Sequence, residues 1–400
     1  MTPILSALER RTGITPAGAV LAALVLPGFA LGRALGSAPV FLLVYGAVLL
    51  LGLSRALAQR RLSVEANRST LPSRIRTDQA VDVTLQITSN RRLSALVFEE
   101  TLDEALGASV RVPVSVLPVG ESLAHGYRFT ARRRGVFQVG PLVAEWTDPF
   151  GLTRKRVVVA PAQTVIVHPR TESVQDRITS REWEDPPIRP PQSKPWPSGF
   201  EFYGMRDYVN GDDPRRIIWT ASAKTDDRYL VRESEQGITD RVCLLLDTDS
   251  TGESFEEAIR AVASLGVKHL ADGFSVTLEA NSARLAASLR GPNARIPLLD
   301  RLAAVQPEDV PLTKALERLF LDRQRNTHNV LVTPHLSEDA ARRLRVLLER
   351  GTSMQLVLVL SEDTDAAMIH RAGSLRCNVV ELKPGASLSR TFARMVGVGR

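Results

Sequence analysis

The sequence has few of the residues with which metalloenzymes and hydrolases do their chemistry. Its 400 residues include two cysteines and six histidines. The cysteines are too few and too far apart for a disulfide framework or a zinc site, which is compatible with a reducing compartment. The histidines show no metal-ligand spacing. The chain also lacks a G-x-S-x-G elbow, a Walker A loop and a Rossmann glycine fingerprint. These absences argue against the common enzyme classes.

Positive charge is concentrated at one end of the sequence. Six arginines and one glutamate lie in the first 61 residues, a net charge of +5 out of a total of +7, so the remaining chain contributes only +2. A protein that binds nucleic acid would need a basic face on a folded domain. Here most of the excess charge flanks apolar segments, which indicates a membrane partner and no nucleic acid.

Two long uncharged runs lie within these first 61 residues. The first covers residues 14–32, and the second begins at residue 38 and continues to about residue 57. A helix of about 20 residues crosses the hydrocarbon core of a bilayer. Neither run has a polar face, so we expect a transmembrane hairpin (domain 1–61) with a tight turn near Gly36. A signal peptide is the competing interpretation, but a second run follows at once and no small-residue cleavage site is present.

Arginine placement predicts the orientation of this hairpin. Arg10 and Arg11 precede the first run, and Arg55, Arg60 and Arg61 follow the second. The loop between the runs carries only one arginine, at position 33. By the positive-inside rule both ends face the cytoplasm. We therefore expect a two-pass protein of the plasma (inner) membrane with most of the chain in the cytoplasm.

From residue 62 to about residue 170 the apolar period changes to two. The stretch Val81–Thr88 alternates cleanly, as a strand with one buried face must. Turn signals such as Ser89-Asn90 and Arg134-Gly135 separate about seven short segments of this kind. The pattern predicts an immunoglobulin-like β-sandwich. It contains no catalytic constellation.

Residues 171–197 are expected to form a linker. Six prolines lie within residues 186–197, and proline cannot donate a hydrogen bond to a sheet. The composition favours an extended, semi-rigid spacer, although a ligand for a WW or SH3 domain is an alternative.

After residue 198 predicted strands and helices alternate, which is typical of a doubly wound, Rossmann-like α/β domain over 198–400. The apolar run Val242–Leu246 indicates a strand buried on both faces. Ser254 and Glu257 have the spacing of a capping box and predict the start of the next helix at Ser254.

Two motifs in this region resemble known families. A buried strand followed by Asp247-Thr248-Asp249-Ser250-Thr251 resembles the D-x-S-x-S cation motif of von Willebrand factor type A domains. The stretch from Ser198 to Ala223, and most specifically Gly211–Ala223, resembles the signature of the DUF58 family of bacterial membrane proteins. The patterns at Arg134–Pro141 and Asp148–Gly151 are similar to those in the same family.

The cation motif departs from the type A pattern. Asp247 and Thr251 offer two oxygen ligands, but Asp249 replaces a serine. Val310 stands where the resemblance implies a threonine, and Thr333-Pro334-His335 stands where it implies an aspartate. Mg²⁺ requires a near-octahedral set of oxygen ligands. We therefore expect a degenerate site without a bound cofactor, and Mg²⁺ at these residues is the alternative.

The signature stretch allows two interpretations. Its arginines and carboxylates could form an ion-paired clamp that pins the segment to the domain, or an exposed docking patch for a partner. The apolar run Ile217–Trp219 suggests burial, which favours the clamp. The candidate residues of either arrangement are Arg206, Asp207, Gly211, Asp212, Asp213, Arg215, Trp219 and Ser222.

We expect a membrane-tethered adaptor and no enzyme. The DUF58 resemblance implies a MoxR-type AAA+ ATPase as partner, with a transglutaminase-like membrane protein as a second one, in assembly or remodelling work at the envelope. One alternative is a cell-surface adhesin with an external type A domain, which the arginine placement opposes. A hydrolase is the other alternative, and His335 with Asp247 is the only pair that such a fold would bring together.

Overall fold

The computed structural model describes residues 12–59, 64–69, 71–174, 202–209, 217–224, 228–234, 241–322, 327–361 and 364–395. The chain forms two compact units, Met1–His168 and Pro169–Arg400.

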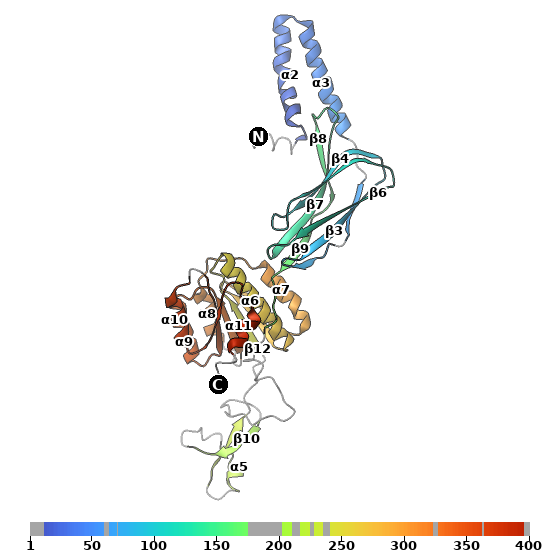
Figure 1. Cartoon of the computed structure of the whole chain (residues 1–400). Coiled ribbons are helices and arrows are strands. Elements are labelled where there is room, and N and C mark those ends of the chain that lie inside the picture. The colour runs from blue at the N-terminus through green and yellow to red at the C-terminus, as the bar shows by residue number, and fades with distance from the viewer. Residues whose placement is uncertain are drawn as a thin grey trace. The chain divides into compact units, whose positions relative to one another are not determined.

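The first unit begins with two apolar helices that lie side by side, α2 (Pro16–Leu35) and α3 (Ala38–Ala58) (Figure 1). The Thr15 hydroxyl caps α2 by accepting a hydrogen bond from Gly18 N, and Gly36 ends the helix in the left-handed conformation. Both helices are long and apolar enough to cross a membrane, and 11% of each candidate span is buried. A core helix of a soluble domain would be mostly buried. The structure thus confirms the two predicted apolar helices.

The rest of this unit is a β domain built from two sheets. One sheet has the strand order β1-β3-β6, and the other has the order β2-β9-β7-β4-β5 with β8 paired to β7. The strands are β1 (Val64–Ser69), β2 (Arg74–Arg76), β3 (Ala80–Ser89), β4 (Leu93–Leu102), β5 (Val110–Leu117), β6 (Ser122–Thr130), β7 (Gly135–Thr147), β8 (Arg154–Ala160) and β9 (Gln163–His168).

The two sheets share an apolar core. Leu85 and Ile87 of β3 pack in one cluster with Phe98 of β4 and Leu142 of β7, and all four side chains are fully buried. Burial alternates along β3, as the period of two predicts. The immunoglobulin-like assignment of this domain stays a prediction.

A buried ion pair lies within the β domain beside Gly140. The Arg68 guanidinium donates to both carboxylate oxygens of Glu100 at 2.9–3.2 Å and to Pro161 O at 2.6 Å, and the two side chains are 2% and 0% exposed. Desolvation raises the pKa of Glu100 against the opposing effect of Arg68. Gly140 has φ +93°, and a Cβ there would overlap Arg68 Nη2. The family-like Gly140-Pro141 pattern therefore makes room for this pair.

Gly140→Ala is expected to destabilise the protein by at least about 2 kcal/mol, because it adds backbone strain and displaces a buried charge from its partner. Gly126→Ala is the matched control, since Gly126 lies in β6 and its added Cβ would meet nothing within 4 Å. Thermal unfolding of the detergent-solubilised full chain measures both. Equal melting temperatures for the two variants would contradict this account of Gly140.

The second unit contains a small antiparallel pair and a six-stranded sheet. The pair is β10 (Phe202–Asp207) with β11 (Leu230–Ser234), accompanied by the short helix α5 (Trp219–Ser222). The sheet has the order β14-β13-β12-β15-β16-β17, in which β14 is antiparallel to β13 and the other neighbours are parallel. Its strands are β12 (Arg241–Leu246), β13 (Ser275–Ala280), β14 (Arg284–Leu289), β15 (Thr327–Thr333), β16 (Met354–Val359) and β17 (Asn378–Leu382).

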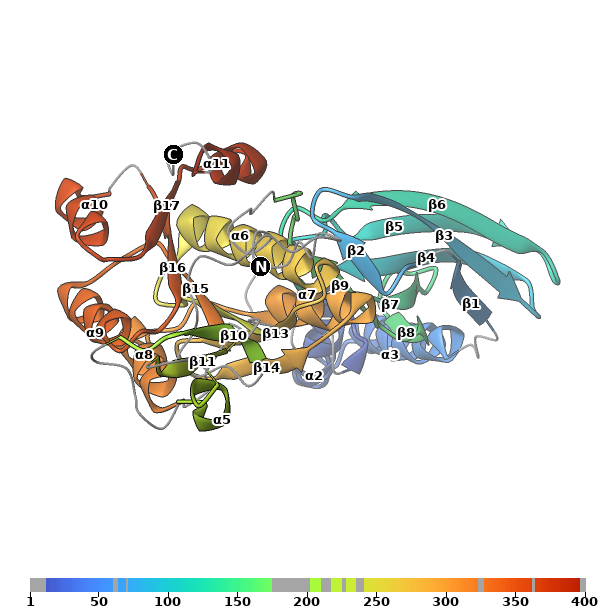
Figure 2. The same cartoon turned by 90° about the horizontal axis from the view of Figure 1, so that it is seen from below.

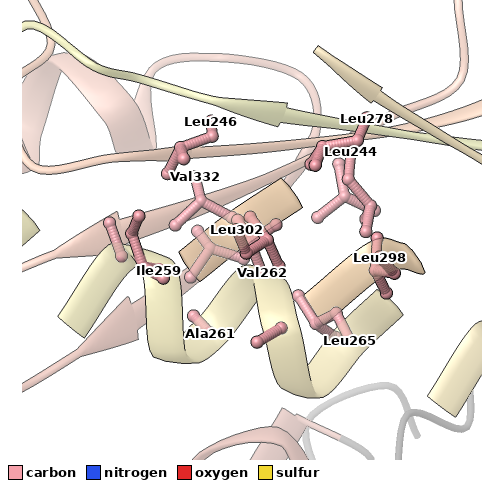
Figure 3. Packing of buried hydrophobic residues seen from close by; sticks show 14 of the residues in the cluster. Leu244, Leu246, Ile259, Ala261, Val262, Leu265, Leu278, Leu298, Leu302 and Val332 are labelled. Carbon is pink, nitrogen blue, oxygen red and sulfur yellow. The ribbon is translucent and has the colours of Figure 1, made fainter. Parts of the chain in front are cut away.

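Helices cover both faces of this sheet (Figure 2). One core cluster contains side chains of α6, α7 and α11, and the other contains side chains of α8, α9 and α10. Figure 3 shows Ile259 and Val262 of α6, with Leu302 of α7, facing strand residues such as Leu244. The helices are α6 (Gly252–Ala271), η2 (Pro292–Ala294), α7 (Arg295–Ala304), α8 (Leu312–Leu321), α9 (Glu338–Glu349), α10 (Ala366–Gly373) and α11 (Leu388–Met395).

Helix α6 begins earlier than the capping-box pattern predicts. Thr251 is its N-cap residue and Gly252, at φ +73°, turns the chain into the helix. The Ser254 hydroxyl instead donates to Thr251 O at 3.3 Å, and Glu257 accepts a hydrogen bond from Arg260. The predicted start at Ser254 is therefore wrong, because the two residues of the pattern have partners elsewhere.

Glu172, near the start of the second unit, connects two helices of that unit, α6 and α11. Its carboxylate accepts hydrogen bonds from Arg260 of α6 and, at 2.9 Å, from Leu388 N at the start of α11. Its backbone N donates to Ser264 Oγ at 3.0 Å. Arg260 is largely buried and also pairs with Glu257. This Glu172 clamp fixes the end of the described linker residues on α6.

Candidate functional site

The α/β sheet has a topological switch point at the carboxyl end of β12. The chain leaves β12 for β13 on one side and later returns to β15 on the other, and crevices at such points are the usual binding sites of open α/β sheets. Asp247 follows β12, Asn281 follows β13 and Thr333 ends β15. All three side chains are buried. Sequence reasoning identified Asp247 and the position of Thr333 but missed Asn281.

Neutral donors surround the carboxylate of Asp247. Asn281 Nδ2 donates to Oδ1 at 2.6 Å, and Asp249 N donates to the same oxygen at 3.1 Å. Thr333 Oγ1 lies 2.6 Å from Oδ2. Asn281 Nδ2 also donates to Val310 O at 2.7 Å. Val310 therefore contributes a backbone carbonyl at the position where the type A resemblance implies a threonine side chain.

Burial raises the pKa of Asp247, against hydrogen bonds from Thr333 and Asn281 that lower it. The Thr333 hydroxyl has a single proton but lies near two acceptors, Asp247 Oδ2 at 2.6 Å and His335 O at 2.7 Å. A proton on Asp247 Oδ2 would satisfy both, since Thr333 would then accept from Asp247 and donate to His335 O. The hydrogen-bond geometry and the desolvation of the carboxylate thus both favour the protonated form of Asp247.

This arrangement does not fit a hard cation. Asp249 and Thr251 are exposed, whereas Asp247 is buried behind them, and a divalent cation would have to displace the N–H and O–H groups that face its carboxylate. Within the described residues, no three His, Cys, Asp or Glu side chains form a group that could hold a metal. The His335 side chain is exposed, and its backbone, through Thr333, makes the contact to this network.

Part of the predicted signature group lies outside the described residues, namely Gly211, Asp212, Asp213 and Arg215. Arg206 and Asp207 lie on β10. Arg206 Nη1 donates to Asp207 O at 3.0 Å. The Asp207 carboxylate lies 3.9 Å from Arg228, and both side chains are mostly exposed, so this pair contributes little to stability.

Ser222 has a structural role in the same element. Its hydroxyl donates to Ile218 O at 3.0 Å and accepts a hydrogen bond from Leu230 N at 2.8 Å. Ile218 N donates to Leu230 O at 2.8 Å, and Ile217 forms a β-bridge with Val231. These contacts hold α5 against the start of β11.

The expectation that Trp219 is buried is wrong. Trp219 is 63% exposed and Tyr229 is 56% exposed. The two rings meet edge to face with their centroids 6.0 Å apart. We call Trp219 and Tyr229 the aromatic pair. Its exposure removes one support for the clamp. Because Asp212, Asp213 and Arg215 lie outside the described residues, the clamp and the docking patch both stay predictions.

The segment that contains both sites has a recognisable family relationship. Residues 204–376 match the DUF58 family, described as a protein of unknown function. We call residues 204–376 the DUF58 segment; it includes the aromatic pair, Asp247, Asn281 and Thr333. The match confirms the predicted resemblance to DUF58.

Comparison with curated proteins finds no match to this chain. Among solved structures, a CARDB domain from Pyrococcus furiosus is 10% identical, with 26% of this chain and 94% of that chain covered and a TM-score of 0.19. A complex of zinc 2-glycoprotein and prolactin inducible protein from human seminal plasma is 13% identical, with coverages of 27% and 97% and a TM-score of 0.17. A β-glucosidase from Listeria innocua is 14% identical, with coverages of 25% and 16% and a TM-score of 0.15. TM-scores of this size do not establish a shared fold.

Asp247→Asn is expected to leave stability almost unchanged, because an amide can accept from Asn281 and Asp249 and donate to Thr333. Asp247→Ala is expected to cost about 2–3 kcal/mol by leaving buried polar groups unpaired. Because the folded pKa of Asp247 is raised, wild-type stability falls as pH rises from its unfolded pKa through the folded one, and the Asn variant lacks this decline. Thermal unfolding of the solubilised full chain across a range of pH measures the stability of the wild type and of both variants.

A magnesium titration of the same samples is the complementary measurement. Saturable Mg²⁺ binding by the wild type that is lost in Asp247→Asn would contradict the closed, neutral site described above.

Proposed function

We propose that this protein is a membrane-anchored adaptor whose DUF58 segment faces the cytoplasm and binds another protein. The observation that carries the proposal is the exposure of the aromatic pair, which lies within the segment that matches the DUF58 family. Tryptophan and tyrosine dominate the binding energy of protein interfaces. The two exposed rings lie next to each other, so they offer a joint aromatic contact surface.

The partner that the family resemblance implies is a MoxR-type AAA+ ATPase, with a transglutaminase-like membrane protein as a second candidate. We propose recruitment of such an ATPase to the membrane for assembly or remodelling of an envelope system. The short β10–β11–α5 element suits this task, because backbone and Ser222 hydrogen bonds hold the aromatic pair in place. Binding then requires little ordering of the element.

We also propose that the α/β domain is type A-like, with a cation site that neutral side chains have closed. Support comes from the strand order with one antiparallel edge strand and from the position of Asp247 at the switch point. The donor set around Asp247 supports the absence of catalytic and metal roles there.

Trp219→Ala is expected to reduce recovery of the MoxR-type ATPase of the same organism by at least about tenfold. Removing a hot-spot aromatic side chain costs about 2 kcal/mol or more, and about 1.4 kcal/mol already corresponds to a tenfold loss of affinity. The measurement is affinity purification of the full chain from membranes, with and without a trapped ATP analogue. Leu321→Ala is the matched control, since Leu321 is 74% exposed on α8 and lies outside the aromatic pair. Recovery of no ATPase in either nucleotide state, or equal recovery by both variants, would rule out this partner at this surface.

Sidedness separates the adaptor from the adhesin. In a background with Cys243→Ala and Cys377→Ala, a cysteine at Ala108 of the β domain is expected to resist a membrane-impermeant maleimide in intact cells and to react after lysis. A cysteine at Ser37, between the two helices, is expected to react in intact cells. The reverse pattern would support the external adhesin.

A further inference from the structure

The base of the helical hairpin is joined to the loop between β7 and β8. Ile14 and Thr153 form an antiparallel β-bridge. Thr15 N donates to Leu152 O at 3.0 Å, and Arg154 N donates to Gly13 O at 2.7 Å. The residues that precede α2 thus extend along the β domain before the helix begins.

The second helix contacts the same region. Ser54 Oγ of α3 lies 2.5 Å from Thr153 Oγ1, and both residues are buried. Trp146 Nε1 donates to Ala58 O at the end of α3 at 3.2 Å. Gly18, in the first turn of α2, has no room for a Cβ because Leu152 O lies against it. Helix α2 is therefore fixed to the β domain at its first turn, and α3 is fixed to it at its last turn.

The loop itself is held in one shape by Asp148. The buried Asp148 carboxylate accepts hydrogen bonds from Thr153 N at 2.5 Å and from Phe150 N at 2.9 Å. Asp148 O accepts one from Gly151 N at 3.0 Å, and Gly151 has φ +72°. This turn presents Phe150, whose side chain is 45% exposed.

Two further turns lie at the same end of the β domain. The strand registers Leu96↔Trp146 and Leu93↔Leu117 place the β3–β4 and β5–β6 turns at this end, and Gly120 N joins them by donating to Ser89 O at 3.0 Å. The three turns, residues 89–92, 118–121 and 148–153, are called the hairpin end. Its exposed residues include the cations Arg91 and Arg92, the apolar Val119 and Phe150, and one acid, Glu121.

We propose that the hairpin end is seated in the headgroup region of the bilayer, with Phe150 and Val119 inserted and Arg91 and Arg92 beside lipid phosphates. Helices of 20 and 21 residues rise about 30 Å, the thickness of the hydrocarbon core. A loop that packs on the first turn of α2 therefore lies where the hydrocarbon ends. Aromatic and basic side chains are favoured at that depth.

The test uses the full chain reconstituted in vesicles of zwitterionic and anionic phospholipids. In the Cys243→Ala, Cys377→Ala background, single cysteines carry an environment-sensitive fluorophore, and phospholipids spin-labelled near the top of the acyl chain quench it. Labels at Phe150→Cys and Val119→Cys are expected to be quenched at least about twofold more than a label at Ala108→Cys, because only the first two enter the interface. Ala108 lies in the β4–β5 loop at the opposite end of the domain.

A label at Leu49→Cys, in the middle of α3, tests the hairpin separately. Quenching at Leu49 by deep spin labels, with Phe150 and Ala108 equally unquenched, would overturn the seating while leaving the membrane anchor intact. Absence of quenching at Leu49 would overturn both. The first outcome leaves the proposed adaptor function intact, whereas the second would remove the membrane anchor that the adaptor proposal includes. Recovery of the ATPase tests protein binding separately from both.

The role of the basic pair has its own control. Quenching at Phe150→Cys is expected to increase with anionic lipid, and the double variant Arg91→Gln, Arg92→Gln should abolish that increase. Arg132→Gln, Arg133→Gln at the opposite end, where both arginines are exposed, should retain it. Identical lipid dependence in the two double variants would overturn the phosphate contact.

Discussion

Much of the attachment of the two apolar helices passes through a loop that the hydrogen bonds of one buried carboxylate, that of Asp148, hold in shape. It binds two backbone N–H groups of its own loop, and that loop then provides the bridge to Ile14 and the contact to Ser54. A buried charge is stable only where such donors surround it. The Asp148–Gly151 pattern, which is similar to one in the DUF58 family, thus lies in the loop that joins the hairpin to the β domain. The hairpin and its β domain form one compact unit for this reason.

A second buried carboxylate, that of Asp247, lies at the carboxyl end of the central strand β12 in the α/β domain and is also surrounded by donors. Asp247 is surrounded by an amide, a hydroxyl and a backbone N–H, so its partners come entirely from the protein. An open cation site would leave carboxylate oxygens free for the metal. Here Thr333 contacts Asp247 Oδ2, and Val310 O accepts a hydrogen bond from Asn281, so these groups bond to one another instead. The polar groups at the switch point are thus largely paired with one another within the protein.

The repetitive features of the fold could be predicted from the sequence, whereas single contacts could not. The two apolar helices and the alternation in β3 follow from periods that extend over many residues. The expectation for Trp219 is wrong because Ile217 and Ile218 beside it suggest a core, whereas the described part of this element is a two-stranded pair with one short helix and leaves the ring 63% exposed. The predicted start of α6 is wrong because Ser254 and Glu257, which fit a capping-box pattern, each bond to a residue three positions away, Thr251 and Arg260.

Asn281 illustrates the limit most clearly. A polar residue after an apolar strand was visible in the sequence, but its role depends on Asp247 and Val310, 34 and 29 positions away. Likewise, Gly140 could be recognised as part of a sequence pattern. The reason for a glycine there, the nearby Arg68–Glu100 pair, could be seen only in the three-dimensional structure.

The Glu172 clamp has a mechanical consequence. Its carboxylate binds α6 through Arg260 and the first turn of α11 through Leu388 N. A load that arrives along the chain from the β domain therefore meets ion-paired contacts before it reaches the sheet. Load on the residues before Glu172 is therefore passed to two helices, α6 and α11. Both helices belong to the same core cluster, so force on that segment would be borne by one face of the sheet as a whole.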